Sequence, residues 1–141
     1  MENDNYFKLE FEAKNVNESF ARGVVALFCT ELEPSLSEIN DIKTAVSEAV
    51  TNSVVHGYNN KGGKIVLEVK IINRTIDIVV TDFGVGISDI EMALQPFYTT
   101  KSDEEHSGMG FTLMDSFMNK LEVKKNTPSG LIVHMQKVIK E

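Results

Sequence analysis

The sequence predicts an α+β fold, a two-layer sandwich in which helices cover one face of a mixed, mainly antiparallel sheet. Strand-like segments come in consecutive runs beside a few helices, whereas a doubly wound fold would alternate strand and helix more strictly. The 141 residues suffice for one normal hydrophobic core, and neither an internal repeat nor a linker divides them. We therefore expect residues 1–141 to form a single domain.

The N-terminal half is expected to hold one strand and two helices. Residues 7–13 alternate apolar and polar side chains, the pattern of a half-buried strand. Asn17 is expected to cap a helix that ends before a proline, and Ser35 or Ser37 to open a second helix over residues 37–56. The apolar residues of the first helix are Phe20, Val24, Leu27 and Phe28, and the apolar stripe of the second is Ile39, Ile42, Val46, Ala49, Val50 and Ser53.

The C-terminal half is expected to supply most of the sheet. Residues 65–72 and 75–81 are rich in β-formers, and Asn73-Arg74 between them predicts a hairpin. A loop with the sequence DFGVG follows. The remaining expected elements are a short helix near 88–94, a helix over 109–119, and strands over 121–125 and 131–137 separated by the turn NTPSG.

Composition limits the classes of function. The net charge of −7 argues against direct binding of nucleic acid, which requires a basic surface. No apolar run approaches the ~20 residues that cross a bilayer, and the polar N-terminus has no apolar signal-peptide core, so we expect a cytoplasmic protein without membrane contact. Cys29 is the only cysteine, and its apolar neighbours make it a core residue.

A polar row runs along the second helix in the segment SEAVTNSVVHGY. Glu48, Asn52 and His56 are spaced by four residues, and at 100° per residue they lie apart from the apolar stripe. A solvated helix face is one explanation. The other is chemical: a carboxylate can accept a proton, and an amide oxygen one turn away suits Mg²⁺, which is often held by few protein groups plus phosphates. His56 precedes a glycine near the helix end, where capping or packing explains it.

The loop DFGVG directly follows an expected strand. Gly84 and Gly86 permit positive φ and close approach of the backbone to a flat ligand. Asp82 at the strand end can accept a hydrogen bond from an exocyclic amine such as that of adenine. A structural turn would account for the same residues.

A second glycine segment opens the third helix. Ser107, Gly108, Met109 and Gly110 place exposed N–H groups at a helix N-terminus, which can bind a phosphate. Lys101 can reach the same anion as a flexible point charge. Each feature alone is weak, but in this order they describe a metal ligand, an adenine contact and a phosphate loop in one site.

These motifs resemble a known fold. ExxxN on a helix, then DxGxG, then a lid and GxG, is similar to the Bergerat-type ATP-binding fold shared by histidine kinases, gyrase B and MutL, the GHKL superfamily. More closely, the runs IKTAVSEAVTNSVVHGYNN, QPFYTTK and SGMGFTLM resemble the anti-sigma F family of endospore-forming bacteria, over nearly the whole chain. That family consists of serine kinases that bind ATP on the helical face of the sheet.

The resemblance implies a role for each candidate residue. Glu48 would be the general base or the orienting carboxylate for the attacking serine hydroxyl, Asn52 the Mg²⁺ ligand, and Asp82 the adenine contact. Arg22, in the matching FAR of the first helix, would contact the sigma factor. The other nucleotide-binding residues implied are Gly84, Gly86, Thr100, Lys101, Ser107, Gly108, Met109 and Gly110. Two departures from the family pattern are His106 before SGMG and Leu131-Ile132 after Gly130.

The implied function is dual. In its ATP form the protein would bind and inhibit a sporulation sigma factor, sigma F, and with ATP and Mg²⁺ it would phosphorylate a serine of the anti-anti-sigma factor, leaving ADP. A homodimer is implied, for which Phe7, Leu9, Phe11 and Phe20 could serve as core or interface, core being the expectation for most. The alternative is a sigma-binding module that uses ATP without phosphotransfer.

Three other classes of kinase or nucleotide-binding protein agree less well with the sequence. No HRD-like loop accompanies DFG, which excludes a eukaryotic-type protein kinase, and GMGFTL does not fit the Rossmann GxGxxG. A histidine-kinase catalytic fragment remains open only with its phosphoaccepting histidine supplied in trans.

Overall fold

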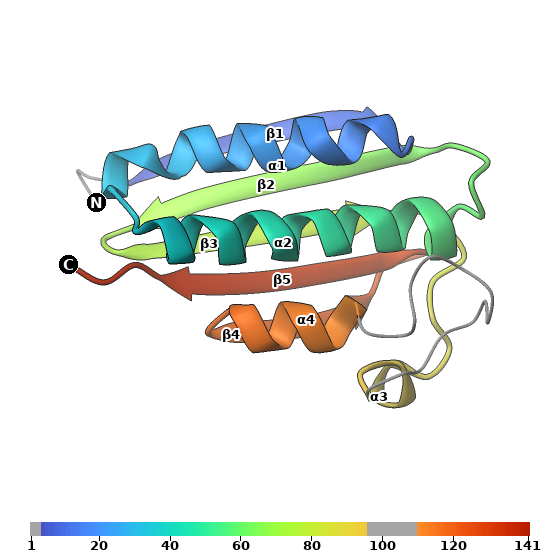
Figure 1. Ribbon diagram of the computed structural model, residues 1–141. Coiled ribbons are helices and arrows are strands. Elements are labelled where there is room, and N and C mark those ends of the chain that lie inside the picture. Colours follow the sequence, from blue (N-terminus) through green and yellow to red (C-terminus); the bar gives the residue numbers. More distant parts are fainter. Residues whose placement is uncertain (1–3, 96–109) are drawn as a thin grey trace.

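A computed structural model describes residues 4–95 and 110–141. In these residues a β-strand comes first and two long helices follow, and then come two strands, two shorter helices and two more strands (Figure 1). The elements are β1 (Asn5–Glu12), α1 (Val16–Phe28), the 3₁₀ turn η1 (Cys29–Leu32), α2 (Leu36–Asn52), the π-helical turn η2 (Ser53–Gly57), β2 (Lys64–Ile72), β3 (Thr75–Asp82), α3 (Ile90–Ala93), α4 (Gly110–Phe117), β4 (Lys120–Lys125) and β5 (Leu131–Val138).

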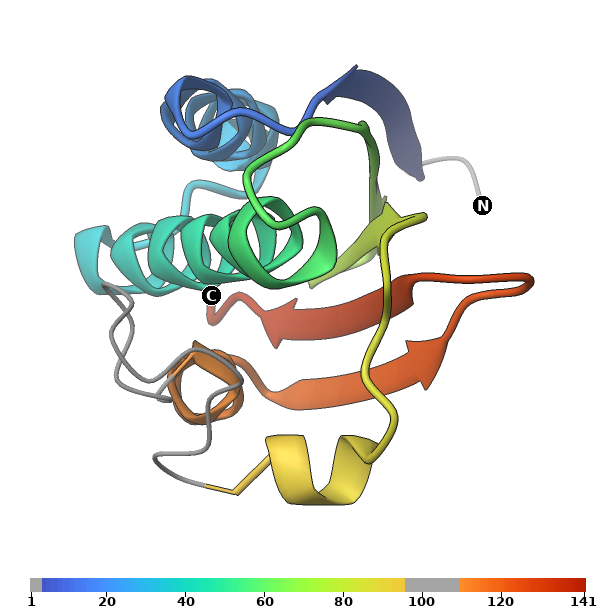
Figure 2. The same ribbon diagram turned by 90° about the vertical axis from the view of Figure 1, so that its right-hand side faces the viewer.

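The strands form one sheet in the order β1-β2-β3-β5-β4, and all four neighbouring pairs are antiparallel. The side view shows two layers, with α1, α2 and α4 on one face of the sheet (Figure 2). The predicted α+β sandwich with helices on one face is therefore confirmed. The predicted hairpin is also present: β2 pairs with β3 through Ile72 and Thr75, and Asn73 takes a positive φ of 55° in the turn.

The core lies between the sheet and the helices. Alternate residues of β2 and β3 face the helices and are buried, as expected from the period of two in a strand. The predicted stripe of α2 is buried from Ile42 to Ser53. Cys29 is fully buried, and burial raises the pKa of its thiol to about 12, so this cysteine is an inert core residue as predicted.

The core-facing side of α1 differs from the prediction. Its buried residues are Ala21 and Val25, while Phe20 and Leu27 are 48% and 74% exposed. In β1 the aromatic and aliphatic side chains on the inner face are partly buried against the core, and Phe7 packs edge-on against Phe28. The expectation of core positions thus holds for β1 but not for Phe20.

The two long helices begin in different ways. Ser35 caps α2: its hydroxyl accepts the Glu38 N–H at 3.0 Å, and the Glu38 carboxylate accepts the Ser35 N–H at 2.8 Å. The prediction that Asn17 caps α1 is wrong, because the helix already begins at Val16. The Asn17 amide instead donates to the Glu12 carbonyl at 2.8 Å, which ties the helix to the end of β1.

The C-terminal end of α2 was predicted as regular helix to residue 56, but it widens into the π turn η2 after Asn52. Such turns frequently occur at functional sites. In Figure 1 this end of α2, the loop after β3 and α3 lie at one end of the molecule, and β1 begins and β5 ends at the other. The predicted site residues on α2 and after β3 therefore lie at the same end.

Candidate functional site

Asp82 is the best-defined part of the site. It ends β3 and is only 2% exposed. Its Oδ2 accepts the Ser53 hydroxyl at 2.7 Å, and its Oδ1 accepts the N–H groups of Gly84 at 3.0 Å and Leu131 at 3.2 Å. A carboxylate accepts about four hydrogen bonds. Counting only donors in residues 4–95 and 110–141, the carboxylate has capacity for one more hydrogen bond, which an exocyclic amine could supply.

The electrostatics of this carboxyl group combine two opposed effects. Burial raises the pKa of Asp82 above its ordinary value, and the hydrogen bonds from Ser53, Gly84 and Leu131 act in the opposite direction. The group is thus a costly buried acid whose orientation is fixed from three sides. That combination is more typical of a ligand contact than of a turn.

The glycines of DFGVG allow the loop to lie directly on η2. A Cβ added at Gly84 would lie 2.1 Å from the carbonyl oxygen of Gly57, so only glycine fits there. The Val85 N–H donates to the same carbonyl at 2.9 Å. Gly86 has a φ of +74°, which a side chain would strain. The loop after β3 and the end of α2 therefore form one surface.

Several residues that support this loop were not predicted from the sequence. The Asn126 amide donates to the Asp82 carbonyl at 2.9 Å, and the Ser129 hydroxyl donates to the Phe83 carbonyl at 3.2 Å. The Tyr58 hydroxyl accepts the Phe83 N–H at 2.7 Å. The turn NTPSG gave no sign of this contact, but Ser53 did give a signal, as the one hydroxyl in an otherwise apolar helix stripe.

Glu48 and Asn52 are partly buried, one turn apart on α2, and lie away from its buried stripe as predicted. A Cβ added at Gly110, the first residue of α4, would lie 3.4 Å from Glu48 Oε1. The carboxylate of Glu48 is therefore adjacent to the N-terminus of α4, where a helix favours negative charge such as phosphate. The site accordingly has an amine-accepting end at Asp82 and an anion-favouring end at Gly110.

The remaining predicted site residues fall into two groups. Arg22 lies between α1 and α2: it forms an ion pair with Glu18, and its guanidinium is 3.4 Å from the Ser47 hydroxyl. It is thus on the helix pair that carries Glu48 rather than in the loop around Asp82. Thr100, Lys101, Ser107, Gly108 and Met109, and also His106, lie outside the described residues.

The donor set can be tested against the expected magnesium ion. The described residues contain no group of three or more histidine, cysteine, aspartate or glutamate side chains arranged to hold a metal. Mg²⁺ does not need such a group, because it is commonly bound through one or two protein oxygens, substrate phosphates and water. The amide of Asn52 and the carboxylate of Glu48, beside an anion-favouring helix end, fit that mode of binding.

Comparison with known proteins shows what family this site belongs to. Residues 10–137 match the family model of the histidine kinase-like ATPase domain. The anti-sigma F factor of Thermoanaerobacter pseudethanolicus is 52% identical over 99% of this chain and 97% of that protein, and the one of Clostridium acetobutylicum is 50% identical over 95% and 94%. The chain belongs to the anti-sigma F factor family.

The fold of this anti-sigma F family member agrees with the match. The catalytic domain of the histidine kinase ThkA superposes with a TM-score of 0.57 at 19% identity, over 94% of this chain and 96% of that domain. The predicted GHKL fold is thereby confirmed, and an ATPase domain of this fold binds a nucleotide. In the part of the chain that the structure describes, the helices are too short or too polar to cross a membrane.

Proposed function

We propose that this protein binds ATP and Mg²⁺ at the end of α2, inhibits a sporulation sigma factor (sigma F) in its ATP form, and phosphorylates a serine of the anti-anti-sigma factor. Membership in the anti-sigma F family supports the partners. The observation that carries the nucleotide assignment is the arrangement at Asp82, a buried carboxylate that accepts three hydrogen bonds from the described part of the chain and has capacity for about one more.

In this proposal the adenine lies at the end of β3. Its exocyclic amine donates to the remaining acceptor position of Asp82, and the loop containing Gly84 and Gly86 forms the floor beneath the ring. The pattern Gly-Thr expected near the adenine in relatives is replaced here by Leu131-Ile132. The backbone N–H of Leu131 already donates to Asp82, so orientation of the carboxylate does not require a side chain there.

The phosphates lie toward the first residue of α4. Gly110 and Asn52 are proposed to flank them, Asn52 as a ligand of Mg²⁺, which would neutralise charge on the phosphate oxygens when bound. From the resemblance, Thr100, Lys101, Ser107, Gly108 and Met109 complete the phosphate-binding set.

Glu48 is proposed as the general base. The serine Oγ of the partner attacks the γ-phosphorus, its proton passes to the Glu48 carboxylate, and the bond from the γ-phosphorus to the bridging oxygen breaks to release ADP. This role is supported by the position of Glu48, whose Oε1 would lie 3.4 Å from a Cβ added at Gly110, the first residue of α4, where the terminal phosphate is expected.

The sigma factor and a second copy of the chain are proposed to bind around α1. Arg22 is the proposed sigma contact. Val16, Phe20 and Leu27 lie within about 40° of one another on α1 at 100° per residue, and they are 73%, 48% and 74% exposed. An exposed apolar stripe on a helix favours a protein interface. We propose that the homodimer uses this side of α1 and that the protein acts in the cytoplasm.

The deciding experiment supplies the protein with γ-labelled ATP, Mg²⁺ and an anti-anti-sigma factor from an endospore former. Label on a serine of the partner is expected, and Glu48→Gln should lower the rate by ~10²-fold or more while nucleotide binding persists. Sigma binding with ATP but no labelled serine would identify the protein as the non-catalytic binding module instead.

A further inference from the structure

A lysine occupies an inward-facing position at the end of β5. The inward residues of this strand are Leu131, Val133 and Met135, which are buried, and the next in the alternation is Lys137, whose side chain is only 13% exposed. Lysine side chains are mostly exposed, and those that are withdrawn from solvent usually have a partner for their charge. The lysine therefore serves a specific polar interaction and not the apolar core.

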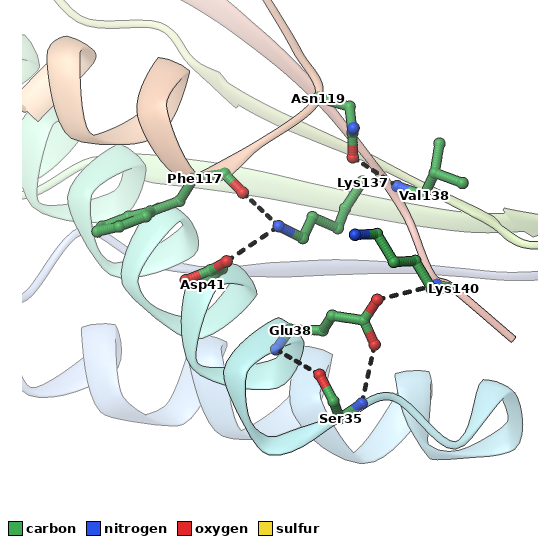
Figure 3. Close-up of polar contacts among 8 residues, drawn as sticks. All are labelled: Ser35, Glu38, Asp41, Phe117, Asn119, Lys137, Val138 and Lys140. Carbon is green, nitrogen blue, oxygen red and sulfur yellow. Dashed lines mark hydrogen bonds and ion pairs between the residues drawn. The ribbon is translucent and has the colours of Figure 1, made fainter.

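Lys137 has two partners on different helices (Figure 3). Its Nζ lies 3.0 Å from Asp41 Oδ2 on α2 and donates to the carbonyl oxygen of Phe117, the last residue of α4, at 2.6 Å. The last carbonyls of a helix lack partners within the helix and favour positive charge. One ammonium group thus links the C-terminal end of α4 to the second turn of α2.

The opposite end of α4 lies at the site. Asp41 and Glu48 are seven residues apart on α2. They therefore point in directions that differ by only about 20° around the helix axis, and they lie about 10.5 Å apart along it. Gly110 and Phe117 are likewise seven residues apart on α4, an equal axial distance of about 10.5 Å. The two helices are therefore antiparallel with contacts at both ends: Lys137 joins Asp41 to Phe117, and Gly110 adjoins Glu48.

Backbone contacts surround the lysine on both sides. The Asn119 N–H donates to the Gln136 carbonyl, and the Val138 N–H donates to the Asn119 side-chain oxygen, each at 2.8 Å. Beyond them, the Lys140 N–H donates to the Glu38 carboxylate at 2.9 Å (Figure 3). These bonds do not involve the ammonium group, so they remain when only the side chain of Lys137 is changed.

From these contacts we propose that Lys137, through Asp41 and Phe117, is a positioning residue for phosphoryl transfer. It sets the axial position of α4 against α2 and thereby the distance between Gly110 and Glu48. That the phosphates bind near Gly110 rests on the proposed function. The proposed adenine site lies on η2 and β3 and does not involve the contacts of Lys137 with Asp41 and Phe117.

The test compares Lys137→Met, which keeps the aliphatic stem, with Lys137→Arg and with the control Lys140→Met. The control removes one positive charge from the same region, but Lys140 is exposed and joins the contacts through its backbone. Three quantities are measured for each variant. The first is hydrogen exchange of the α4 amides without nucleotide, the second is the affinity for ATP and for adenosine, and the third is kcat and KM for serine phosphorylation.

For Lys137→Met we expect faster exchange in α4 with α1 unchanged, roughly tenfold weaker ATP binding with adenosine binding unchanged, and a fall in kcat of up to about 10²-fold, the loss typical of a misplaced reacting group. Lys137→Arg should restore part of kcat, and Lys140→Met should behave as wild type.

Two results overturn the proposal. One is unchanged exchange in α4. The other is a lower melting temperature with wild-type ATP affinity and kcat in the folded protein, because this would make the lysine purely structural. If Lys137→Met does not fold, Asp41→Asn carries the same test with the same expected direction. A wild-type protein that ignores ATP would refute the proposed function, while the exchange result would still decide whether Lys137 fixes α4.

Discussion

The Asp82→Asn substitution separates two roles of this buried side chain: its hydrogen bonds within the protein and its proposed hydrogen bond to adenine. The amide oxygen can still accept the N–H groups of Gly84 and Leu131, and the amide nitrogen then faces the Ser53 hydroxyl, which can rotate to accept. The packing is unchanged because the two side chains have the same shape. What changes is the remaining position: it was an acceptor, and it becomes an N–H donor facing the amine of adenine.

The expected loss of affinity follows from the bond that disappears. A hydrogen bond to a charged group contributes about 1.5–3 kcal/mol, and each 1.4 kcal/mol is tenfold in the dissociation constant. Calorimetric titration should therefore show ATP binding weakened by at least about 10-fold and up to ~10²-fold. Stability should not fall, because the substitution removes a charge whose burial is unfavourable.

The pH dependence of the free energy of unfolding checks the claim that the charge of Asp82 is unfavourable for stability. The pKa of Asp82 is higher in the folded protein than its ordinary value of 3.8, so the folded state binds the proton more tightly than the unfolded state. The wild type therefore loses stability as pH rises from that ordinary value through the folded pKa, whereas Asp82→Asn does not. Urea unfolding of both proteins across this window should show the variant gaining relative stability with rising pH and then levelling off. A variant that is less stable at neutral pH yet binds ATP normally would refute the assignment.

Four further substitutions test other parts of the structure. Asn52→Ala should abolish the gain in ATP affinity that Mg²⁺ provides, measured by titration with and without a chelator; an unaltered gain would contradict the metal assignment. Gly84→Ala should lower the free energy of unfolding by about 1–3 kcal/mol through a clash with the Gly57 carbonyl, whereas Gly23→Ala, whose Cβ meets nothing within 4 Å, should raise it by up to about 1 kcal/mol; equal effects would rule out the clash. Ser35→Ala should lower the free energy of unfolding by about 1 kcal/mol in urea denaturation through loss of the cap, and no change would mean that the bond is absent in solution.

Features determined by local sequence were predictable. The hairpin of β2 and β3 needs two β-rich runs and a residue that tolerates positive φ, and Asn73 supplies the latter. The cap at Ser35 and the buried stripe of α2 likewise depend on neighbours within one or two turns. For the same reason the separation of Glu48 and Asn52 from the apolar stripe could be predicted from helix geometry alone.

Features determined by contacts distant in sequence were not. The π turn that brings Ser53 to Asp82 is fixed by the loop packed against it. The burial of Lys137 depends on Asp41, 96 residues away. Such pairings arise from the tertiary fold, which a single sequence does not display. One local contact was also missed: the Asn17 side chain bonds the carbonyl of Glu12, five residues earlier, instead of capping α1.

The strand β5 connects the two ends of the site. Its first residue, Leu131, orients the carboxylate of Asp82, and six residues later, about 20 Å along a strand, Lys137 holds the end of α4. Because β5 is paired on both sides, by β3 and by β4, it can slide only by breaking both sets of hydrogen bonds. The spacing between the adenine end and the support of α4 is therefore set by a rigid element, and changes at the two ends should contribute independently to nucleotide affinity.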